Sequence, residues 1–224
     1  MSLHVDLFWG IRSPYTYLGS ERYKRIQDQY NVTFRVKVVL PGLLRHPESA
    51  ARFNPLFFRY ALLDLARVAA YHGLPFSYAN PDPLVQDKTT MHVAAEQPHI
   101  HRLSRLAVLA DRAGRGFQFV YHLSRLIWGS GLKWDEGDHL AEVAASAGLN
   151  LQKMEASIVG QEADLDRVIE ANGAALTAAG HWGIPTAVFL DEPFFGQDRI
   201  ELLVWRMRQH GLTHRHEPST LASA

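Results

Sequence analysis

Residues 3–40 contain the pattern that constrains the fold of this chain most strongly. Residues 3–9 (LHVDLFW) are apolar and β-prone, whereas residues 33–40 (TFRVKVVL) alternate between apolar and polar side chains. Residues 14–29 lie between them and place apolar side chains at helical spacing. Two strands joined through a helix are expected to run parallel, with a right-handed crossover. The chain is therefore expected to begin with the β-α-β unit of an α/β domain.

The middle of the chain follows a different pattern. Between about residue 56 and residue 165, few segments have the alternation of a strand. Gly73 and Gly148 follow two amphipathic segments, as expected where helices end. The amphipathic patterns predict helices over 56–72, 99–112, 116–128 and 138–147. This part of the chain is therefore predicted to be all-helical.

Strand patterns return near the C-terminus. Residues 186–190 (TAVFL) form a predicted strand, and Asp191 with Glu192 predicts a hairpin turn into residues 193–195. A last helix is expected over residues 199–210. The order of elements is β-α-β, a helical insertion, and α-β-β-α. This is the order of an α/β, thioredoxin-like fold with a large inserted all-helical domain.

The same order predicts the domain boundaries. Residues 1–50 and 166–212 are expected to form a discontinuous thioredoxin-like domain, and residues 51–165 the helical insertion domain. Residues 213–224 are polar and lack an apolar pattern, so a flexible tail is expected there.

Composition and charge exclude several classes of function. Lys plus Arg and Asp plus Glu both number 23, whereas nucleic-acid binding normally leaves an excess of basic residues. No apolar run reaches the roughly 20 residues that span a bilayer, and no signal-peptide pattern precedes the first strand. The chain has no cysteine, which excludes disulfides, thiolate metal ligands and a cysteine nucleophile. We expect a cytoplasmic protein that binds neither nucleic acid nor membrane.

Ser13 stands where the first strand passes through a short turn into the first helix, and Pro14 suits the first helical position. Ser13 could serve only as an N-cap that accepts an N–H of the first turn. Alternatively, its hydroxyl could donate to a thiolate whose charge the helix N-terminus stabilises. In thioredoxin-like folds a reactive cysteine stands at this position. Any sulfur chemistry here must therefore use the sulfur of another molecule.

Gly183-Ile184-Pro185-Thr186 precedes a predicted strand. A trans proline at a strand entrance is the common arrangement. A cis bond before Pro185 would instead expose the N–H and carbonyl of Ile184 for pairing with a peptide-like ligand. The residues alone leave both arrangements open.

The segment 194–201 (FFGQDRIE) begins the last predicted helix. Asp198 and Glu201 have the spacing of a capping box, which is a purely structural role. Alternatively, the free N–H groups of this helix start could hold a ligand carboxylate while Asp198 pairs with an ammonium group. Gly196 would allow close approach to the backbone. A ligand with an α-amino acid end would suit this second arrangement.

Four motifs occur in a specific order along the chain. They are SPYTYL from Ser13, DLARVAAYHGLPF from Asp64, GIPTAVF from Gly183 and FFGQDRIELL from Phe194. Together they resemble the 2-hydroxychromene-2-carboxylate isomerase family, which is related to kappa-class glutathione transferases within the DsbA-like thioredoxin group. The resemblance covers nearly the whole chain. It implies a thioredoxin fold with a helical insertion, a glutathione cofactor and a homodimer.

The resemblance also implies roles for individual residues. Ser13 would face the glutathione sulfur, and Ile184, before a cis Pro185, would pair with the cysteinyl backbone. The γ-glutamyl end would be held by four consecutive residues, Phe195, Gly196, Gln197 and Asp198. Arg45 stands where the family has a lysine in the substrate pocket, and Asn54 where it has an asparagine before proline. Arg45 and Asn54 are therefore the candidate substrate-binding residues, with Arg45 gripping a substrate carboxylate.

The implied activity is that of a glutathione-dependent isomerase of the cis-trans type, whose thiolate adds reversibly to a conjugated aromatic keto acid or chromene. A kappa-like glutathione transferase would use the same thiolate without regenerating it. A non-catalytic glutathione-binding protein would have the same fold with the thiolate site blocked. A metal-binding protein is the remaining alternative, because His92 and Glu96 are four residues apart, with His99 and His101 nearby. The isomerase hypothesis itself requires no metal.

Overall fold

The computed structural model describes residues 2–48, 54–87, 89–90 and 92–215. Its strands are β1 (Leu3–Trp9), β2 (Val32–Val38), β3 (Thr186–Phe189) and β4 (Glu192–Phe195). Its helices are α1 (Pro14–Gln29), α2 (Gly42–Arg45), α3 (Pro55–Tyr71), α4 (Pro98–Arg112), α5 (Gly116–Gly129), α6 (His139–Ser146), α7 (Leu151–Ile158), α8 (Glu162–Ala178) and α9 (Ile200–Gln209). A short 3₁₀ helix, η2 (Gln197–Arg199), leads directly into α9.

The strands form one sheet with the order β2-β1-β3-β4. β1 and β2 are parallel, with Leu3 opposite Val32 and Trp9 opposite Val38, which confirms the predicted β-α-β unit. β3 runs antiparallel to β1, and β4 runs antiparallel to β3. The helices α2 to α8 lie between β2 and β3 in the sequence. The predicted thioredoxin-like architecture with a helical insertion is therefore confirmed.

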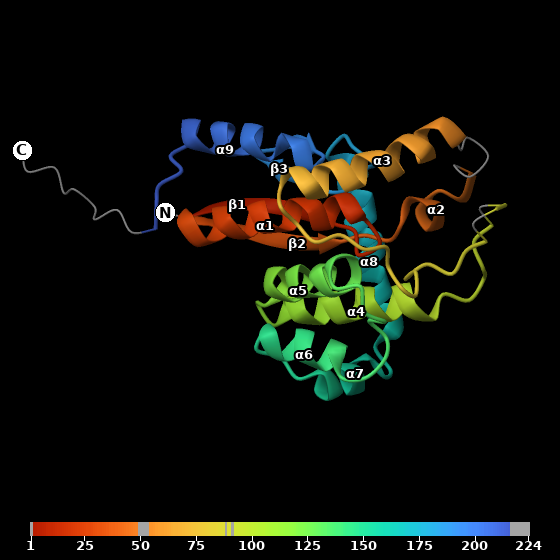
Figure 1. Cartoon of the computed structure of the whole chain (residues 1–224). Coiled ribbons are helices and arrows are strands. Elements are labelled where there is room, and N and C mark those ends of the chain that lie inside the picture. Colours follow the sequence, from red (N-terminus) through yellow and green to blue (C-terminus); the bar gives the residue numbers. More distant parts are fainter. Residues whose placement is uncertain (1, 49–53, 88, 91, 216–224) are drawn as a thin grey trace, which may run out of the picture.

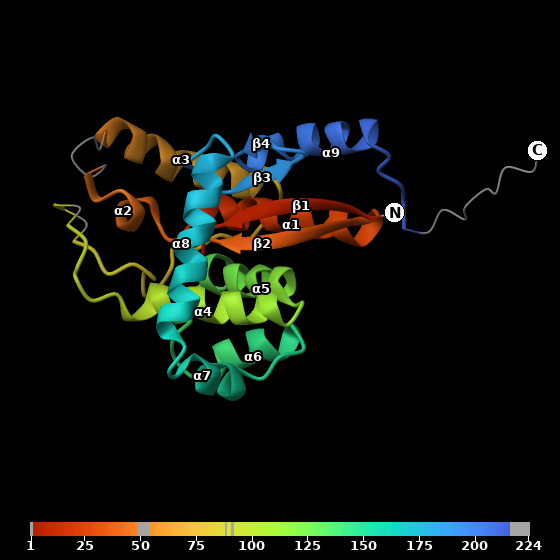
Figure 2. The same cartoon turned by 180° about the vertical axis from the view of Figure 1, so that it is seen from behind.

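Helices cover the sheet on several sides (Figures 1 and 2). In Figure 1, α3 and α9 lie above the sheet, and the inserted helices α4 to α7 lie below it. α8 runs along the back of the molecule from α7 to the start of β3, as Figure 2 shows. Thr186 at the start of β3 pairs with Phe8 near the end of β1. This path brings the chain after α8 to the end of the sheet where α1 begins.

Aromatic side chains join the inserted helices to the sheet. The Trp9 and Phe117 rings meet edge-on with centroids 6.1 Å apart, and Trp9 Nε1 donates to Ser124 Oγ at 3.2 Å. Trp128 Nε1 donates to the Ile11 carbonyl at 3.0 Å. These side chains are buried, so both the loss of apolar surface from water and the satisfied indole N–H groups stabilise the contact. They hold the turn between β1 and α1 against a packed core.

The hairpin between β3 and β4 turns one residue earlier than predicted. Leu190 and Asp191 form the turn, and their φ angles are 50° and 62°. Glu192 already belongs to β4, where it pairs with Phe189. A two-residue hairpin needs this left-handed backbone at both turn positions. Leucine rarely adopts it, which is why the sequence pointed to the polar pair Asp191-Glu192 instead.

The predicted domain limits lie in different structural settings. The limit between residues 50 and 51 falls outside the described residues, and residue 165 lies inside α8. At the start of the expected tail, the Asn31 N–H donates to the Thr213 carbonyl at 2.9 Å. The Arg215 N–H donates to the Gln29 carbonyl at the same distance. The chain is thus tied to the end of α1 as far as residue 215, and residues 216–224 lie outside the described part.

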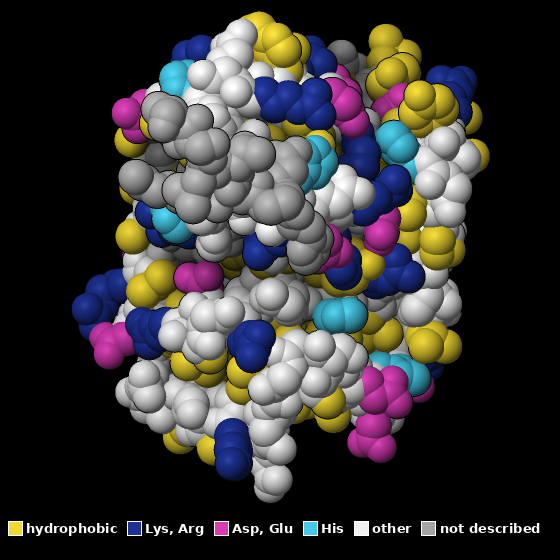
Figure 3. All heavy atoms as spheres, turned by 90° about the vertical axis from the view of Figure 1, so that its left-hand side faces the viewer, with side chains coloured by type: hydrophobic (Ala, Val, Ile, Leu, Met, Phe, Trp, Pro, Cys, Tyr) yellow, Lys and Arg dark blue, Asp and Glu magenta, His cyan; other side chains and the backbone are white. Residues whose placement is uncertain are grey.

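Charged side chains of both signs are interspersed on the face of the molecule where β1 begins (Figure 3). Such a mixed surface agrees with the equal numbers of basic and acidic residues in the sequence. Among the described residues, no helix combines the length and the apolar character that crossing a bilayer requires.

Candidate functional site

Ser13 lies at the N-terminus of α1. Its backbone is extended, its N–H donates to the Gly10 carbonyl at 3.0 Å, and Pro14 starts the helix. The Ser13 hydroxyl oxygen accepts from the Thr16 N–H at 3.3 Å, which confirms the N-cap. The hydroxyl hydrogen has no acceptor among the described residues. A hydroxyl can accept and donate at the same time, so capping leaves the Ser13 proton available to a ligand.

Ile184 lies next to the turn that carries Ser13. Its side chain packs in a small apolar cluster with Phe8, Val39, Leu176 and Val188. Gly10 permits this close approach, because a Cβ at position 10 would overlap the Ile184 side chain and lie 3.3 Å from the Ser13 Cβ. The structure therefore brings two predicted site residues, Ser13 and Ile184, to one place from opposite ends of the chain.

The peptide bond between Ile184 and Pro185 is cis, as the resemblance implied. The Ile184 N–H and carbonyl form no hydrogen bond with the part of the chain that the structure describes. The Pro185 carbonyl accepts from the Gly196 N–H at 2.8 Å. This bond joins the proline turn to the end of β4 and places the start of η2 beside it.

Asp198 lies in the 3₁₀ helix η2 and does not cap α9. Gly196 has a φ of 98°, and neither η2 nor α9 has a side-chain cap hydrogen bond. Asp198 Oδ2 accepts from Arg199 Nη1 at 2.6 Å, while its Oδ1 would lie 2.5 Å from a Cβ at position 196. The capping-box alternative is therefore not realised. Only glycine suits position 196, because of both its φ angle and the adjacent carboxylate.

A pocket of about 460 Å³ opens between η2, α1 and α3, and we call it the α1–α3 pocket. It is lined by Arg22, Arg67, Val68, Tyr71, His72, Gln197, Asp198 and Glu201. Arg22 Nη2 donates to Gln197 Oε1, and Arg22 Nη1 lies 3.3 Å from Glu201 Oε1. Gln197 and Asp198, both predicted to hold an amino-acid end, thus lie in a pocket with charges of both signs.

The α3 wall of this pocket was not predicted. Arg67, Tyr71 and His72 come from the DLARVAAYH motif, which contributed to the resemblance without an assigned role. Residues three or four apart on a helix share a face, so the spacing of Arg67 and Tyr71 indicates one face of α3. The sequence contains no signal for what that face meets.

Two titratable groups near this pocket are perturbed. Burial lowers the pKa of His72, and the Arg22 cation lowers it further, so the folded chain favours the neutral form of this side chain. Burial also raises the pKa of Tyr15 above its usual range, and the Tyr15 hydroxyl donates to Asp64 Oδ2 at 2.9 Å. Tyr60 donates to the other oxygen of Asp64 at 3.2 Å. The Tyr15–Asp64 bond fastens α3 to the first turn of α1.

Phe195 belongs to a stack of rings and does not line the α1–α3 pocket. Its ring lies on His181 with centroids 4.1 Å apart, and His181 stacks on Trp182 at 4.6 Å. The Gly183 N–H donates to His181 Nδ1 at 2.9 Å, and the Phe195 ring fills the space that a Gly183 Cβ would need. The stack therefore fixes the backbone just before the cis proline, while Trp182 remains 69% exposed.

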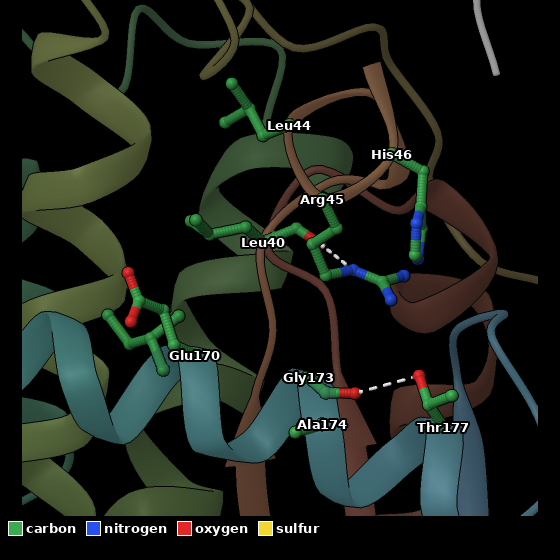
Figure 4. Close-up of a pocket in the computed structure, with 9 residues that line it drawn as sticks. Leu40, Leu44, Arg45, His46, Glu170, Gly173, Ala174 and Thr177 are labelled. Atoms are coloured by element: carbon green, nitrogen blue, oxygen red, sulfur yellow. Dashed lines mark hydrogen bonds between the residues drawn. The ribbon is translucent and has the colours of Figure 1, made fainter. Parts of the chain in front are cut away.

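Arg45 lines a second pocket, of about 390 Å³, which we call the α2–α8 pocket (Figure 4). The other lining residues are Leu40, Leu44, His46, Ile169, Glu170, Gly173, Ala174 and Thr177. Arg45 Nε donates to the Leu40 carbonyl at 2.9 Å, and Nη2 donates to the Trp182 carbonyl at 2.7 Å. Burial lowers the pKa of the Arg45 guanidinium, which nevertheless stays charged. The bond to Trp182 places this cation close to the proline turn.

Asn54 lies apart from both pockets. Its Oδ1 accepts from the Leu56 N–H at 2.9 Å, so Asn54 is the N-cap of α3. Its side chain is exposed and lines neither the α1–α3 nor the α2–α8 pocket. The structure thus brings Arg45, but not Asn54, to a pocket, and the Arg45 bond to Trp182 connects that pocket to the segment before Pro185. Ser13 itself lines neither pocket.

The histidines of the metal alternative are separated by their local structure. His92 and Glu96 precede α4, which begins at Pro98, so their four-residue spacing is not helical. His99 packs edge-on against Trp134 with centroids 5.2 Å apart. Within the described ranges, no group of three or more His, Cys, Asp or Glu side chains is placed to hold a metal ion.

A curated protein matches most of this chain. A 2-hydroxychromene-2-carboxylate isomerase from Pseudomonas putida is 22% identical over 205 residues. These residues cover 89% of this chain and 91% of that protein. The predicted resemblance to this isomerase is therefore confirmed over most of the chain.

Solved structures share the fold. A 2-hydroxychromene-2-carboxylate isomerase matches with a TM-score of 0.70 at 20% identity, covering 93% of this chain and 96% of that chain. The cytosolic disulfide reductase DsbM from Pseudomonas aeruginosa, solved with GSH, matches with a TM-score of 0.55 at 14% identity, covering 92% and 100%. A model of the DSBA-like thioredoxin domain matches residues 4–208. The chain belongs to the family of DSBA-like thioredoxin domains.

Proposed function

We propose that this protein is a glutathione-dependent isomerase similar to 2-hydroxychromene-2-carboxylate isomerase. One observation carries the proposal: the Ser13 hydroxyl proton has no acceptor, and the nearby Ile184 backbone has no partner, among the described residues. A hydroxyl donor beside an unpaired backbone N–H and carbonyl suits a thiol carried by a peptide. The similarity to the Pseudomonas putida isomerase supports the isomerase activity, and the reductase of the same fold that was solved with GSH supports glutathione as the ligand.

Glutathione fits the residues at three points. Its cysteinyl backbone would pair with the Ile184 N–H and carbonyl, as an added strand pairs with a sheet edge. Its sulfur would face Ser13 at the positive end of α1. The N–H groups of Gln197 and Asp198 have no partner in the described part of the chain, so they can hold the γ-glutamyl carboxylate. The Asp198 carboxylate suits the ammonium group of the same end.

Glutathione, when bound, would supply a thiolate for reversible addition to a conjugated carbon of the substrate, which would leave a single bond free to rotate in place of the double bond. The role of this protein is to keep the sulfur ionised and to orient the substrate. The Ser13 hydroxyl donates to the sulfur and the α1 dipole favours its negative charge, so the pKa of the bound thiol is expected to fall. Ser13 thus acts as a hydrogen-bond donor and forms no covalent bond with the substrate.

Arg45 would bind the carboxylate of the aromatic substrate. Leu40, Leu44 and Ile169 provide apolar walls for the aromatic part in the α2–α8 pocket. Two backbone carbonyls fix the orientation of the guanidinium, and its remaining N–H groups are free to donate to a carboxylate. The Arg45 cation also favours the negative charge that develops on a substrate oxygen when a thiolate adds to the conjugated carbon.

Product analysis tests the reaction. The purified protein is incubated with glutathione and 2-hydroxychromene-2-carboxylate, and the substrate spectrum and the free-thiol concentration are followed together. An isomerase changes the spectrum at a glutathione-dependent rate while the thiol concentration stays constant. Loss of one thiol per substrate converted would indicate a glutathione transferase, and binding without conversion would favour the non-catalytic alternative. Failure to bind glutathione would contradict the proposal.

A homodimer, which the resemblance implied, is part of this proposal. α3 exposes three large apolar side chains, Leu56, Phe57 and Leu63, each more than half accessible. A partner copy that covers this surface would remove it from water. Light scattering during size exclusion is expected to give twice the mass of one chain, and a monomer mass at micromolar concentration would contradict the expectation.

A further inference from the structure

Arg67 is a cation of the α1–α3 pocket whose guanidinium is not paired with an acidic side chain within the described chain. It lines the pocket from α3, and its side chain forms no hydrogen bond or ion pair with any described residue. Arg22, the other arginine of this pocket, is bound to Gln197 and Glu201, and its side chain is only 14% exposed. The pocket therefore contains one arginine with partners and one whose donors are free.

Asp198 contributes an opposite charge to the same pocket. Its ion pair with Arg199 joins two neighbouring, exposed side chains, and pairs of this kind contribute little in water. Arg67 and Asp198 both line the pocket but are not paired with each other. Two opposite charges that share a pocket without touching leave room for a ligand that carries both charges.

We propose that Arg67 binds the α-carboxylate of the γ-glutamyl end of glutathione, opposite the ammonium group that Asp198 binds. This inference rests on the proposed glutathione-dependent function and adds a residue from a different helix to the site. The N–H groups of Gln197 and Asp198 approach the carboxylate from η2, whereas Arg67 approaches it from α3. A carboxylate accepts about four hydrogen bonds, so its two oxygens can satisfy both sets of donors.

In this arrangement α3 carries the residue that distinguishes glutathione from thiols without the α-carboxylate. Asp64, one turn before Arg67, accepts from the Tyr15 hydroxyl at the start of α1. This bond fixes the distance between Arg67 and the Ser13 end of the site. A thiol without the α-carboxylate would leave Arg67 solvated and would lose one charged hydrogen-bond partner. Glutathione is therefore expected to bind more tightly than a thiol that lacks this group.

Three thiols separate the two charges experimentally. Glutathione carries the α-carboxylate and the α-ammonium group, whereas glutaryl-cysteinylglycine keeps only the carboxylate and 4-aminobutyryl-cysteinylglycine keeps only the ammonium. Calorimetric titration under reducing conditions measures the Kd of each thiol for the wild type, Arg67→Gln and Arg67→Lys. Arg59→Gln is the matched control, because Arg59 is exposed on the same helix and lines neither pocket.

Arg67→Gln is expected to weaken the binding of glutathione and of glutaryl-cysteinylglycine about tenfold, the usual effect of removing a charged hydrogen-bond partner. The affinity for 4-aminobutyryl-cysteinylglycine is expected to stay within about twofold, because this thiol lacks the α-carboxylate and keeps only the carboxylate of its glycine end. Arg67→Lys keeps the charge and is expected to lose less than Arg67→Gln. Arg59→Gln is expected to leave all three affinities unchanged.

An equal loss with all three thiols, or no loss with any, would overturn the role of Arg67. A loss of glutathione affinity in Arg59→Gln as large as in Arg67→Gln would also overturn it, because a general charge effect would then be sufficient. Failure of the wild type to bind glutathione would instead contradict the proposed function. Thermal unfolding of each variant checks that the chain remains folded.

Discussion

The α1–α3 and α2–α8 pockets differ in how their charges are balanced. In the α2–α8 pocket, the half-buried Arg45 donates to two backbone carbonyls, and the carboxylate that lines the pocket, Glu170, is exposed. In the α1–α3 pocket, Arg67 and Asp198 have opposite charges that no bond joins. Both pockets therefore contain both signs of charge, but backbone carbonyls orient the arginine of the α2–α8 pocket, whereas Arg67 of the α1–α3 pocket has no side-chain partner in the described chain.

This difference indicates which ligand each pocket serves. Apolar walls beside an oriented guanidinium suit a flat acid, whereas balanced charges suit the zwitterionic end of an amino acid. Hydrogen bonds connect both pockets to the segment around Pro185: Arg45 donates to the Trp182 carbonyl, and the Gly196 N–H, just before η2, donates to the Pro185 carbonyl. We expect the sulfur to lie between the two ligands near this segment. Substitutions in one pocket are therefore expected to leave the binding of the other ligand unchanged.

Of the predicted effects, the largest is the change in glutathione affinity expected from Asp198→Asn. The amide keeps the shape of the side chain but loses the partner of the ammonium group, so the Kd of glutathione should rise about tenfold to thirtyfold. The KM of the acidic substrate, measured at saturating glutathione, should not change. Calorimetry and steady-state kinetics measure the two constants. An equal rise in both would show that the pockets do not act separately.

Arg45→Gln is expected to give the converse pattern with a smaller effect. Loss of the guanidinium should raise the KM of an acidic substrate about fivefold to tenfold, because a charge-assisted hydrogen bond to its carboxylate is lost. The Kd of glutathione should stay the same. Arg45→Lys, which keeps the charge but not the planar geometry, should fall between the wild type and Arg45→Gln in steady-state assays. A weakened glutathione affinity in Arg45→Gln would contradict the separation of the pockets.

The smallest expected effect is the contribution of His72, in the α1–α3 pocket, to the pH dependence of stability. Burial and Arg22 lower the pKa of folded His72, so the unfolded chain takes up a proton more readily than the folded chain. The free energy of unfolding should therefore fall as the pH drops through the unfolded pKa of roughly 6.5, until folded His72 is also protonated.

Denaturant titrations at about pH 7.5 and about pH 5.5 measure this loss. His72→Gln should lose less stability between the two pH values than the wild type does. The same loss in both proteins would mean that His72 does not make this contribution.

The parts of the site that could be predicted depend on local sequence. The N-cap at Ser13 follows from a serine and a proline between a strand and a helix, because those residues suit the first turn whatever lies around it. The parallel pairing of β1 and β2 follows from their patterns and the helix between them. The fold was therefore largely predictable, and so was the position of Ser13 within it.

The remaining parts depend on tertiary contacts that the sequence pattern does not contain. Asp198 has capping-box spacing, but the Pro185 carbonyl holds the Gly196 N–H and the chain continues into η2. The α3 residues around Arg67 have helical spacing, yet only the folded chain shows that they face η2. Asn54 was expected in the substrate pocket and instead caps α3, where a local hydrogen bond accounts for it.

The pKa of the bound glutathione thiol, in the wild type and in Ser13→Ala, tests the central claim most directly. The ultraviolet absorbance of the thiolate, followed against pH with the protein in excess, reports this value. The wild type is expected to lower the pKa of the bound thiol below that of free glutathione, because the Ser13 proton and the α1 N-terminus favour the thiolate. Ser13→Ala is expected to raise it again by about one unit or more. A bound thiol with the same pKa in both proteins would contradict the role of Ser13.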